Sequence, residues 1–272
     1  MRRLTEAELS EYKENGYLIV KDVIDTKVVD EMMDFVAHVI SLECGDKSKV
    51  SKLSKDQILN DALIKLKKEN PSSSSWIYQT ILSSYALKKF FVKSEVSELA
   101  MQLLNIQDEN NLGTVSPAFR FDIPGDVRNV RTWHQDSSYF LENEKGHEHL
   151  VTWIPMNKAT KDNGSVIIAK DTHKVGRLDR EHVKAAGFSS EQYTTDDKFF
   201  NDAELDYIEA GPGDIAFINM DLIHKSGENI TTDEVRYTAQ IRFNTINKET
   251  YRPVFLKPEY PEYNRTKELT LD

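Results

Sequence analysis

The sequence has a single cysteine, Cys44, and no apolar run that approaches the ~18 residues needed to span a membrane. One cysteine cannot form an internal disulfide, and no cluster of cysteines and histidines surrounds it that could build a structural zinc site. The start of the chain is basic but leads into acidic residues rather than an apolar segment, so it does not resemble a secretory signal peptide. We therefore expect a cytoplasmic protein without a membrane partner.

Basic residues are in the minority, because 35 Lys and Arg face 45 Asp and Glu and leave a net charge of −10. Non-specific nucleic-acid binding needs a basic surface, so nucleic acid is not an expected partner. The sequence contains neither a Gly-rich phosphate loop nor a Gly-x-Ser-x-Gly nucleophile motif. Hydrophobic residues make up 39% of the chain, enough for a sizeable core. These features favour a soluble protein whose partner is a small-molecule substrate.

The first hundred residues have a mainly helical pattern. Thr5 and Glu8 form a capping box, which predicts a short helix that ends near Asn15-Gly16. A strand is expected at 17–20, followed by helical regions at about 26–43, 55–69 and 76–104. The helix that begins at 55 should end before Pro71, with a linker from Ser72 to Ser75 after it.

The pattern changes after about residue 111, where turn residues separate short runs rich in β-branched and aromatic residues. Strands are expected near 113–121, 130–136, 150–156, 165–169, 214–219 and 234–244. Helices followed by strands predict one α+β domain over residues 1–272. Its helical part should cover about 1–110, and a double-stranded β-helix, the jelly-roll barrel of cupins, about 111–250.

Three residues of the second half have the composition of a metal site. His134 and Asp136 are two positions apart, so on a strand their side chains point to the same side. His224 follows 88 positions after Asp136. Two imidazoles and a carboxylate can occupy one face of an octahedral metal and leave the other open, as in non-haem Fe(II) oxygenases. A His-x-Asp pair is common by chance, however, and each histidine alone is more simply explained as a surface or core residue.

The segment from Val235 to Phe243 alternates strictly between apolar and polar residues. Its polar face carries Arg236, Thr238, Gln240 and Arg242. The simplest explanation is an amphipathic strand with its polar face in water. In a barrel, the apolar face could instead pack on the helical layer while the polar face lines a wet cavity, where Arg236 would bind a carboxylate through two hydrogen bonds.

The other histidines have simpler explanations, since solvated histidines are common. We expect His147 and His149 in a charged loop, His173 in a turn and His182 exposed on a helical stretch.

Two further features could serve a substrate. Arg120, Arg128 and Arg131 precede the metal motif and could attract an anion, although a solvated loop explains them equally well. Residues 188–207 form an acidic and aromatic segment long enough to act as a lid.

Four stretches of the sequence together resemble the phytanoyl-CoA dioxygenase family, a branch of the Fe(II)- and 2-oxoglutarate-dependent oxygenases. They are His134-Gln135-Asp136 with Tyr139-Phe140, Thr152-Trp153-Ile154-Pro155, Asp162-Asn163-Gly164-Ser165 leading to Lys170-Asp171-Thr172-His173-Lys174, and His224-Lys225-Ser226-Gly227-Glu228-Asn229 running to Arg236. They occur in the order typical of the family. Each stretch is unspecific alone, but the set is specific and, with the opening helix and strand, covers most of the chain.

The resemblance implies a role for particular residues. The iron ligands would be His134, Asp136 and His224. Arg236 would bind the distal carboxylate of 2-oxoglutarate, with Ser226, Gln135 and Trp153 beside that co-substrate. The gap from His224 to Arg236 is one residue longer than the commonest family spacing, which leaves Arg242, on the same strand face, as a second candidate. Lys170-Asp171-Thr172-His173 also departs from the usual Pro-Gly-Ser/Thr-His, a change expected to alter only a turn.

The resemblance also implies a reaction, in which Fe(II), 2-oxoglutarate and O₂ hydroxylate an unactivated C–H bond of a small polar or anionic metabolite and yield succinate and CO₂. The presence of Asp136 favours hydroxylation, because related halogenases lack this carboxylate and bind chloride in its place. Two alternatives stay open. One is a cupin-like metalloenzyme that does not use 2-oxoglutarate, in which Arg236 would lie far from the metal. The other is a non-catalytic jelly-roll binding module with structural histidines.

Overall fold

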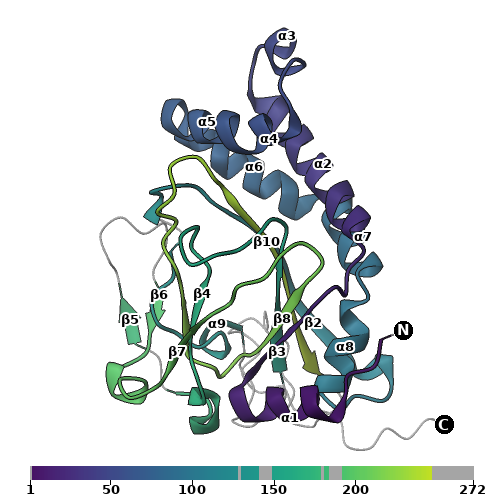
Figure 1. Cartoon of the computed structure of the whole chain (residues 1–272), viewed down its shortest axis with the longest axis vertical. Coiled ribbons are helices and arrows are strands. Elements are labelled where there is room, and N and C mark those ends of the chain that lie inside the picture. Colours follow the sequence, from purple (N-terminus) through teal and green to yellow (C-terminus); the bar gives the residue numbers. More distant parts are fainter. Residues whose placement is uncertain (1, 128–129, 141–148, 179–180, 184–191, 247–272) are drawn as a thin grey trace, which may run out of the picture.

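In the computed structural model, which describes residues 2–127, 130–140, 149–178, 181–183 and 192–246, a helical layer packs on antiparallel β-sheets (Figure 1). The protein is therefore of the α+β class, as predicted. Helices come mainly from the first hundred residues and strands mainly from the rest. Among the described residues, no helix combines the length and the apolar character needed to cross a membrane.

The chain begins with a capped helix, α1 (Glu6–Asn15), and a strand, β1 (Tyr17–Val20). The Thr5 hydroxyl accepts a hydrogen bond from the Glu8 N–H at 3.2 Å, and the Glu8 carboxylate accepts one from the Thr5 N–H at 2.7 Å. This is the predicted capping box. Gly16 ends the helix with a left-handed φ of 78°, and a Cβ at this position would lie 2.4 Å from the His173 ring. Both the backbone conformation and the lack of space therefore require glycine.

The helical layer differs from the sequence prediction in where its helices begin and end. It consists of α2 (Thr26–Glu43), α3 (Lys47–Val50), α4 (Lys55–Gln57), the π-helical turn η1 (Ile58–Ala62), α5 (Leu63–Glu69), α6 (Pro71–Ser83), α7 (Tyr85–Lys93) and α8 (Val96–Leu103). The predicted linker from Ser72 to Ser75 is wrong, because these residues lie inside α6. Pro71 starts that helix in the first turn, where its missing N–H costs no hydrogen bond.

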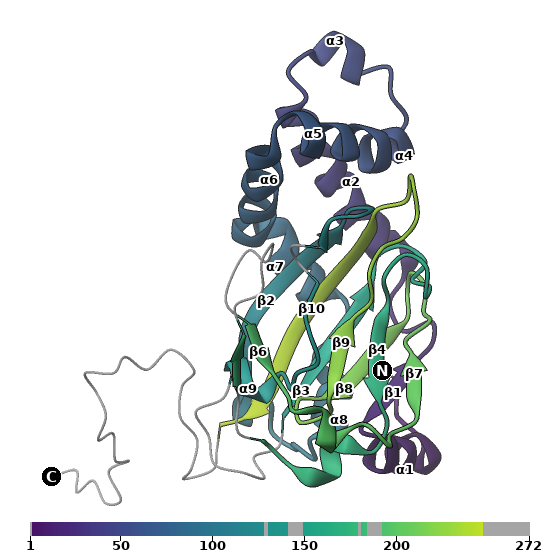
Figure 2. The ribbon, with the colours of Figure 1, turned by 90° about the vertical axis from the view of Figure 1, so that its left-hand side faces the viewer.

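The strands form two main antiparallel sheets, which are seen side by side in Figure 2. The larger has the order β1-β8-β3-β10-β2, with β2 (Leu112–Asp122), β3 (His149–Pro155), β8 (Ile215–Asn219) and β10 (Arg236–Thr245). The smaller has the order β7-β4-β9, with β4 (Val166–Ala169), β7 (Leu205–Tyr207) and β9 (His224–Ser226). A separate pair joins β5 (Glu181–Val183) to β6 (Gln192–Thr194). Short helical turns are η2 (Glu109–Asn111), α9 (Ser137–Phe140), η4 (Thr172–Val175) and η5 (Asp197–Phe199).

The larger sheet separates two apolar cores. One core lies between this sheet and the helices and includes Leu150 of β3, and the other includes Trp153 of β3 together with Ile168 of the smaller sheet. Successive side chains of a strand point to opposite faces, so β3 contributes to both cores and every one of its residues is buried. The apolar residues of 235–243 belong to the helical core, so this strand has the second of the two orientations considered, with its apolar face on the helical layer.

Some predictions are wrong where only one to three residues pair with a neighbouring strand. Residues 130–136 form no strand; within that range only His134 makes an isolated bridge. His182 lies in β5 and not in a helix. Strand β9 was not predicted, because three residues are too few to show a period. The division into one domain over the whole chain stays a prediction.

Replacement of Ile40 by alanine should test the core between the helices and the larger sheet. Ile40 is fully buried in α2, so Ile40→Ala should lower the free energy of unfolding by about 2–5 kcal/mol in urea titrations. Leu42 of the same helix is 50% exposed, and Leu42→Ala should change the free energy by less than about 0.5 kcal/mol. Equal losses in the two variants would contradict the assigned burial.

Candidate active site

Three side chains from two distant segments meet at one point. A backbone bridge joins the segments: the His134 N–H donates to the His224 carbonyl at 2.9 Å, and the His224 N–H donates to the His134 carbonyl at 3.0 Å. Asp136 immediately precedes α9. Each of the three residues offers one ligand atom, and these atoms all lie within 4.8 Å of one another. All three side chains are buried.

Both imidazoles are oriented by their own backbone. Nδ1 of His134 lies 2.7 Å from the Thr132 carbonyl oxygen, and Nδ1 of His224 lies 2.8 Å from that of Leu222. A carbonyl only accepts, so each Nδ1 carries the hydrogen and each Nε2 keeps its lone pair for a metal. The Nε2 atoms lie 3.3 Å and 3.8 Å from Oδ1 of Asp136. Burial, together with the neighbouring His134, lowers the pKa of His224 to about 4, so this ring is neutral at physiological pH, as a metal ligand must be.

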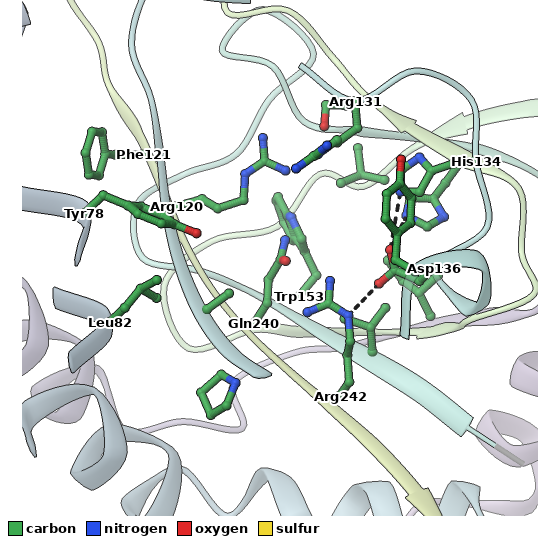
Figure 3. Close-up of a pocket in the computed structure, with 18 of the residues that line it drawn as sticks. Tyr78, Leu82, Arg120, Phe121, Arg131, His134, Asp136, Trp153, Gln240 and Arg242 are labelled. Atoms are coloured by element: carbon green, nitrogen blue, oxygen red, sulfur yellow. Dashed lines mark hydrogen bonds and ion pairs between the residues drawn. The ribbon is translucent and has the colours of Figure 1, made fainter. Parts of the chain in front are cut away.

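The carboxylate of Asp136 is held from both sides. Its Oδ1 faces the two imidazoles, and its Oδ2 accepts a hydrogen bond from Nε of Arg242 at 2.9 Å, shown as a dashed line in Figure 3. Burial alone would raise the pKa of Asp136, but the charge of Arg242 and the neighbouring imidazoles outweigh it and hold the pKa well below its usual range. The donor set is therefore one ionised carboxylate and two imidazoles, which fits a divalent iron ion.

These residues lie on the wall of a cavity of about 640 Å³. Tyr78 and Leu82 of α6 and Phe121 of β2 line one side, while Trp153 and Gln240 of the larger sheet lie nearer to Asp136 (Figure 3). A volume of this size is within the range of small-molecule sites. It can hold a small co-substrate and a second molecule.

The structure brings some of the predicted co-substrate contacts to this cavity and not others. Trp153 and Ser226 line it. Gln135 is fully buried elsewhere: its side-chain amide donates to the carbonyls of Gly176 and Asp221, and its oxygen accepts from the Leu178 N–H. Gln135 therefore fixes neighbouring loops, and its predicted place beside the co-substrate is not supported.

The two candidate arginines differ in their surroundings. Arg236 is 2% exposed and is not among the residues that line the cavity. Its guanidinium donates to the Asp122 carboxylate at 2.8 Å and to the Thr238 hydroxyl, and lies 5.5 Å from the centre of the Trp153 ring. Arg242 lines the cavity and contacts Asp136 directly. The alternation of β10 placed both arginines on this face, but only the structure identifies the carboxylate that each one binds.

The remaining predicted residues lie outside the metal group or outside the described residues. His149 is a buried residue of β3 and not of a loop, and its Nε2 lies 3.4 Å from Oδ1 of Asp221. Nε2 of His173 lies 3.0 Å from the carbonyl oxygen of Lys13. Arg120 and Arg131 both line the cavity. His147, Arg128 and residues 188–191 of the predicted lid fall outside the described residues.

Comparison with known proteins gives one family. A family model described as phytanoyl-CoA dioxygenase (PhyH) matches residues 12–237, a range that includes the three metal-site residues and Arg236. A probable phytanoyl-CoA dioxygenase of Caenorhabditis elegans is 30% identical over 107 residues, which are 39% of this chain and 34% of that protein. A 1-deoxypentalenic acid 11-beta-hydroxylase of Streptomyces arenae is 32% identical over 104 residues, 37% of this chain and 35% of that protein. Each match thus spans about a third of the relative's length.

A solved structure shares the fold over nearly the whole chain. EvdO2 from Micromonospora carbonacea var. aurantiaca, crystallised in complex with 2-oxoglutarate, superposes with a TM-score of 0.58. The superposition covers 94% of this chain and 96% of that one at 15% sequence identity. At this identity the likeness speaks for the fold alone.

Metal binding should stabilise the protein through the three ligands. In the absence of oxygen, added Fe(II) should raise the unfolding temperature. At a free Fe(II) concentration of 100 times its dissociation constant, the free energy of unfolding should increase by about 2.7 kcal/mol. A chelator should reverse the gain. His134→Ala should abolish it, whereas His38→Ala, which removes an exposed histidine of α2, should retain it. A full metal effect in His134→Ala would refute the site.

Arg242 should contribute to metal affinity through Asp136. Arg242→Gln removes the charged partner of Oδ2, and loss of such a supporting contact typically weakens metal binding by about 10–100-fold. Competition with a chelator of known affinity would measure the change. Arg3→Gln, at an exposed arginine, is the matched control and should bind metal like the wild type. Unchanged affinity in Arg242→Gln would show that the contact does not support the ligand.

Proposed function

We propose that this chain, which belongs to the phytanoyl-CoA dioxygenase family, is a non-haem iron dioxygenase that hydroxylates an unactivated C–H bond of a small polar or anionic metabolite. Its cofactor is Fe(II), and its co-substrates are 2-oxoglutarate and O₂. The observation that carries the proposal is the convergence of His134, Asp136 and His224 on the wall of a cavity. This cavity is large enough for both the co-substrate and the substrate. We interpret the surrounding sheets as the jelly-roll barrel predicted from the sequence. We also infer that the protein is cytoplasmic.

When bound, Fe(II) and 2-oxoglutarate supply the oxidising chemistry: one atom of O₂ enters succinate as CO₂ is released, and the other becomes the hydroxyl group of the product. The chain's own residues provide the setting. His134 and His224 present their Nε2 atoms, and Asp136 presents an ionised oxygen because Arg242 compensates its charge. Trp153 and the apolar residues around it exclude water from the cavity wall. The carboxylate of Asp136 would hold the metal where related halogenases bind chloride, and its presence favours hydroxylation.

Arg236 is the better candidate for the anchor of 2-oxoglutarate. The co-substrate would bind the metal through its keto acid, which would leave its second carboxylate several bonds further from the metal. Arg242 contacts the metal ligand Asp136 itself and is therefore too close to receive that carboxylate. Arg236 lies against the ring of Trp153, a lining residue. Its guanidinium donates to Asp122, Thr238 and the Asn163 carbonyl, which uses three of its five N–H groups and leaves two for a ligand. Ser226 lines the same cavity and can add a hydroxyl contact.

The proposal predicts a visible charge-transfer band when the apoprotein is titrated without oxygen, first with Fe(II) and then with 2-oxoglutarate. The band arises only when the keto acid chelates the metal, so it should appear in the wild type and vanish in His134→Ala. A flat spectrum with Fe(II) demonstrably bound would overturn the proposal and favour a cupin-like metalloenzyme. Absence of metal binding with retained binding of a small molecule would favour a binding module.

The same titration distinguishes the two arginines. Arg236→Gln should need about tenfold more 2-oxoglutarate, or more, to develop the band, because a charged hydrogen bond to the distal carboxylate is lost. Its affinity for Fe(II) should stay unchanged. Arg242→Gln should show the opposite pattern, with weaker metal binding and little effect on 2-oxoglutarate. A reversal of these patterns would assign the anchor to Arg242.

A further inference from the structure

The lysine, arginine and aspartate side chains of the cavity lining are engaged within the protein. Their contacts are ion pairs or, in one case, a guanidinium over an aromatic ring, and they join Lys67 to Asp126, Arg242 to Asp136, Arg120 to Asp122 and Arg131 to Tyr139. A paired charge has less to gain from a ligand, because its partner already replaces part of the lost hydration. The neutral polar side chains of the lining are therefore the better candidates for contacts with a substrate.

Gln240 presents an amide to the cavity. It lies on the cavity face of β10, two residues before Arg242, and is opposite Ala118 of β2 and Trp153 of β3 in the sheet. No described residue forms a hydrogen bond with its side chain. The small side chain of Ala118 leaves space toward β2, where the amide can both donate and accept a hydrogen bond. Figure 3 shows Gln240 between Asp136 and the side chains of α6.

Helix α6 turns one stripe of side chains to the same cavity. Ile77 and Ile81 are fully buried in the core between the helices and the larger sheet, which fixes the rotation of the helix. Tyr78 and Leu82 each follow one of these residues and are four positions apart, so they share a face, and both line the cavity. The Tyr78 ring packs edge-on against Phe121 of β2, with ring centres 6.4 Å apart. This contact sets the position of the ring at the edge strand of the sheet.

The hydroxyl of Tyr78 faces the amide of Gln240 across the cavity. Figure 3 shows this hydroxyl pointing from α6 into the space in front of Gln240. Like the amide, it has no hydrogen-bond partner within the part of the chain that the structure describes. A polar group that loses its water to a ligand and stays unpaired costs free energy, so a ligand in this space has to satisfy both groups. Each group is neutral and can donate as well as accept.

We propose that Gln240 and Tyr78 form a subsite for a neutral polar group of the primary substrate, a carboxamide or a hydroxyl, which can itself donate and accept. The inference rests on the proposed function, in which the metal and Arg236 take the co-substrate. Leu82 and Phe121 line the adjoining wall and pack against an apolar part of the same molecule. The substrate is thereby narrowed from a polar or anionic metabolite to a neutral polar one with an apolar skeleton.

The test is a calorimetric titration of the Fe(II)- and 2-oxoglutarate-loaded protein without oxygen, with hexanamide and hexanoate as probes. The two molecules have nearly the same shape and differ in charge. Hexanamide should bind about tenfold more tightly, or more, because hexanoate has to give up the hydration of its charge to neutral groups. Heptanamide should bind about fourfold more tightly than hexanamide, because one more methylene is buried against Leu82 and Phe121.

Variants assign the effect to particular side chains. Gln240→Leu and Tyr78→Phe each remove one hydrogen-bonding group and should weaken the binding of hexanamide by about two- to tenfold. Their affinities for Fe(II) and 2-oxoglutarate should stay unchanged, which also shows that the variants fold. Leu82→Ala should reduce the gain in affinity from hexanamide to heptanamide. Tyr85→Phe and Gln107→Leu, at exposed positions, are the matched controls and should bind hexanamide like the wild type.

Three results would overturn the subsite. The first is a wild type that does not bind hexanamide, or that binds hexanoate as tightly. The second is a hexanamide affinity in Gln240→Leu or Tyr78→Phe that equals that of the wild type. The third is a higher 2-oxoglutarate concentration needed for the charge-transfer band in these two variants, which would assign both residues to the co-substrate. Failure of the proposed function is distinguishable, because it removes the band from the wild type, whereas amide binding can still be titrated on the apoprotein.

Discussion

The backbone bridge between His134 and His224 is the contact on which the site depends. Two reciprocal hydrogen bonds hold residues that are 90 positions apart in the sequence, and they set the two imidazoles side by side with ring centres 4.4 Å apart. The carbonyls of Thr132 and Leu222 then turn each Nε2 toward Asp136. Because the bridge is isolated, its geometry relies on the sheets around it: β9 continues from His224 into pairing with β4. The positions of the three candidate metal ligands are therefore set by the backbone.

Buried charge is the second constraint, since an unpaired ion in a protein interior is costly. Asp136 is compensated by Arg242, and Asp122 by two arginines at once. The pair of Asp122 and Arg236 joins β2 to β10, and the two residues lie directly opposite each other in the sheet.

The sequence was informative where a period or a motif extended over several residues. The alternation of residues 235–243 predicted both faces of β10, and the capping box predicted α1. His134 and Asp136 do lie together, although the strand on which that prediction rested does not form. The sequence failed where the structure depends on partners distant in the chain. The three residues of β9 are ordered by pairing with β4, and the direction of Gln135 is set by carbonyls of Gly176 and Asp221. Nothing local to Arg236 indicates that Asp122, 114 positions away, will bind it.

Helix α6 gives the cavity a wall that has no part in holding the metal. Tyr78 and Leu82 come from this helix. Of the three candidate metal ligands, His134 and Asp136 come from the segment before α9, and His224 comes from β9 of the smaller sheet. Substitutions along one side of α6 can therefore change the shape of the substrate space while the metal geometry stays intact.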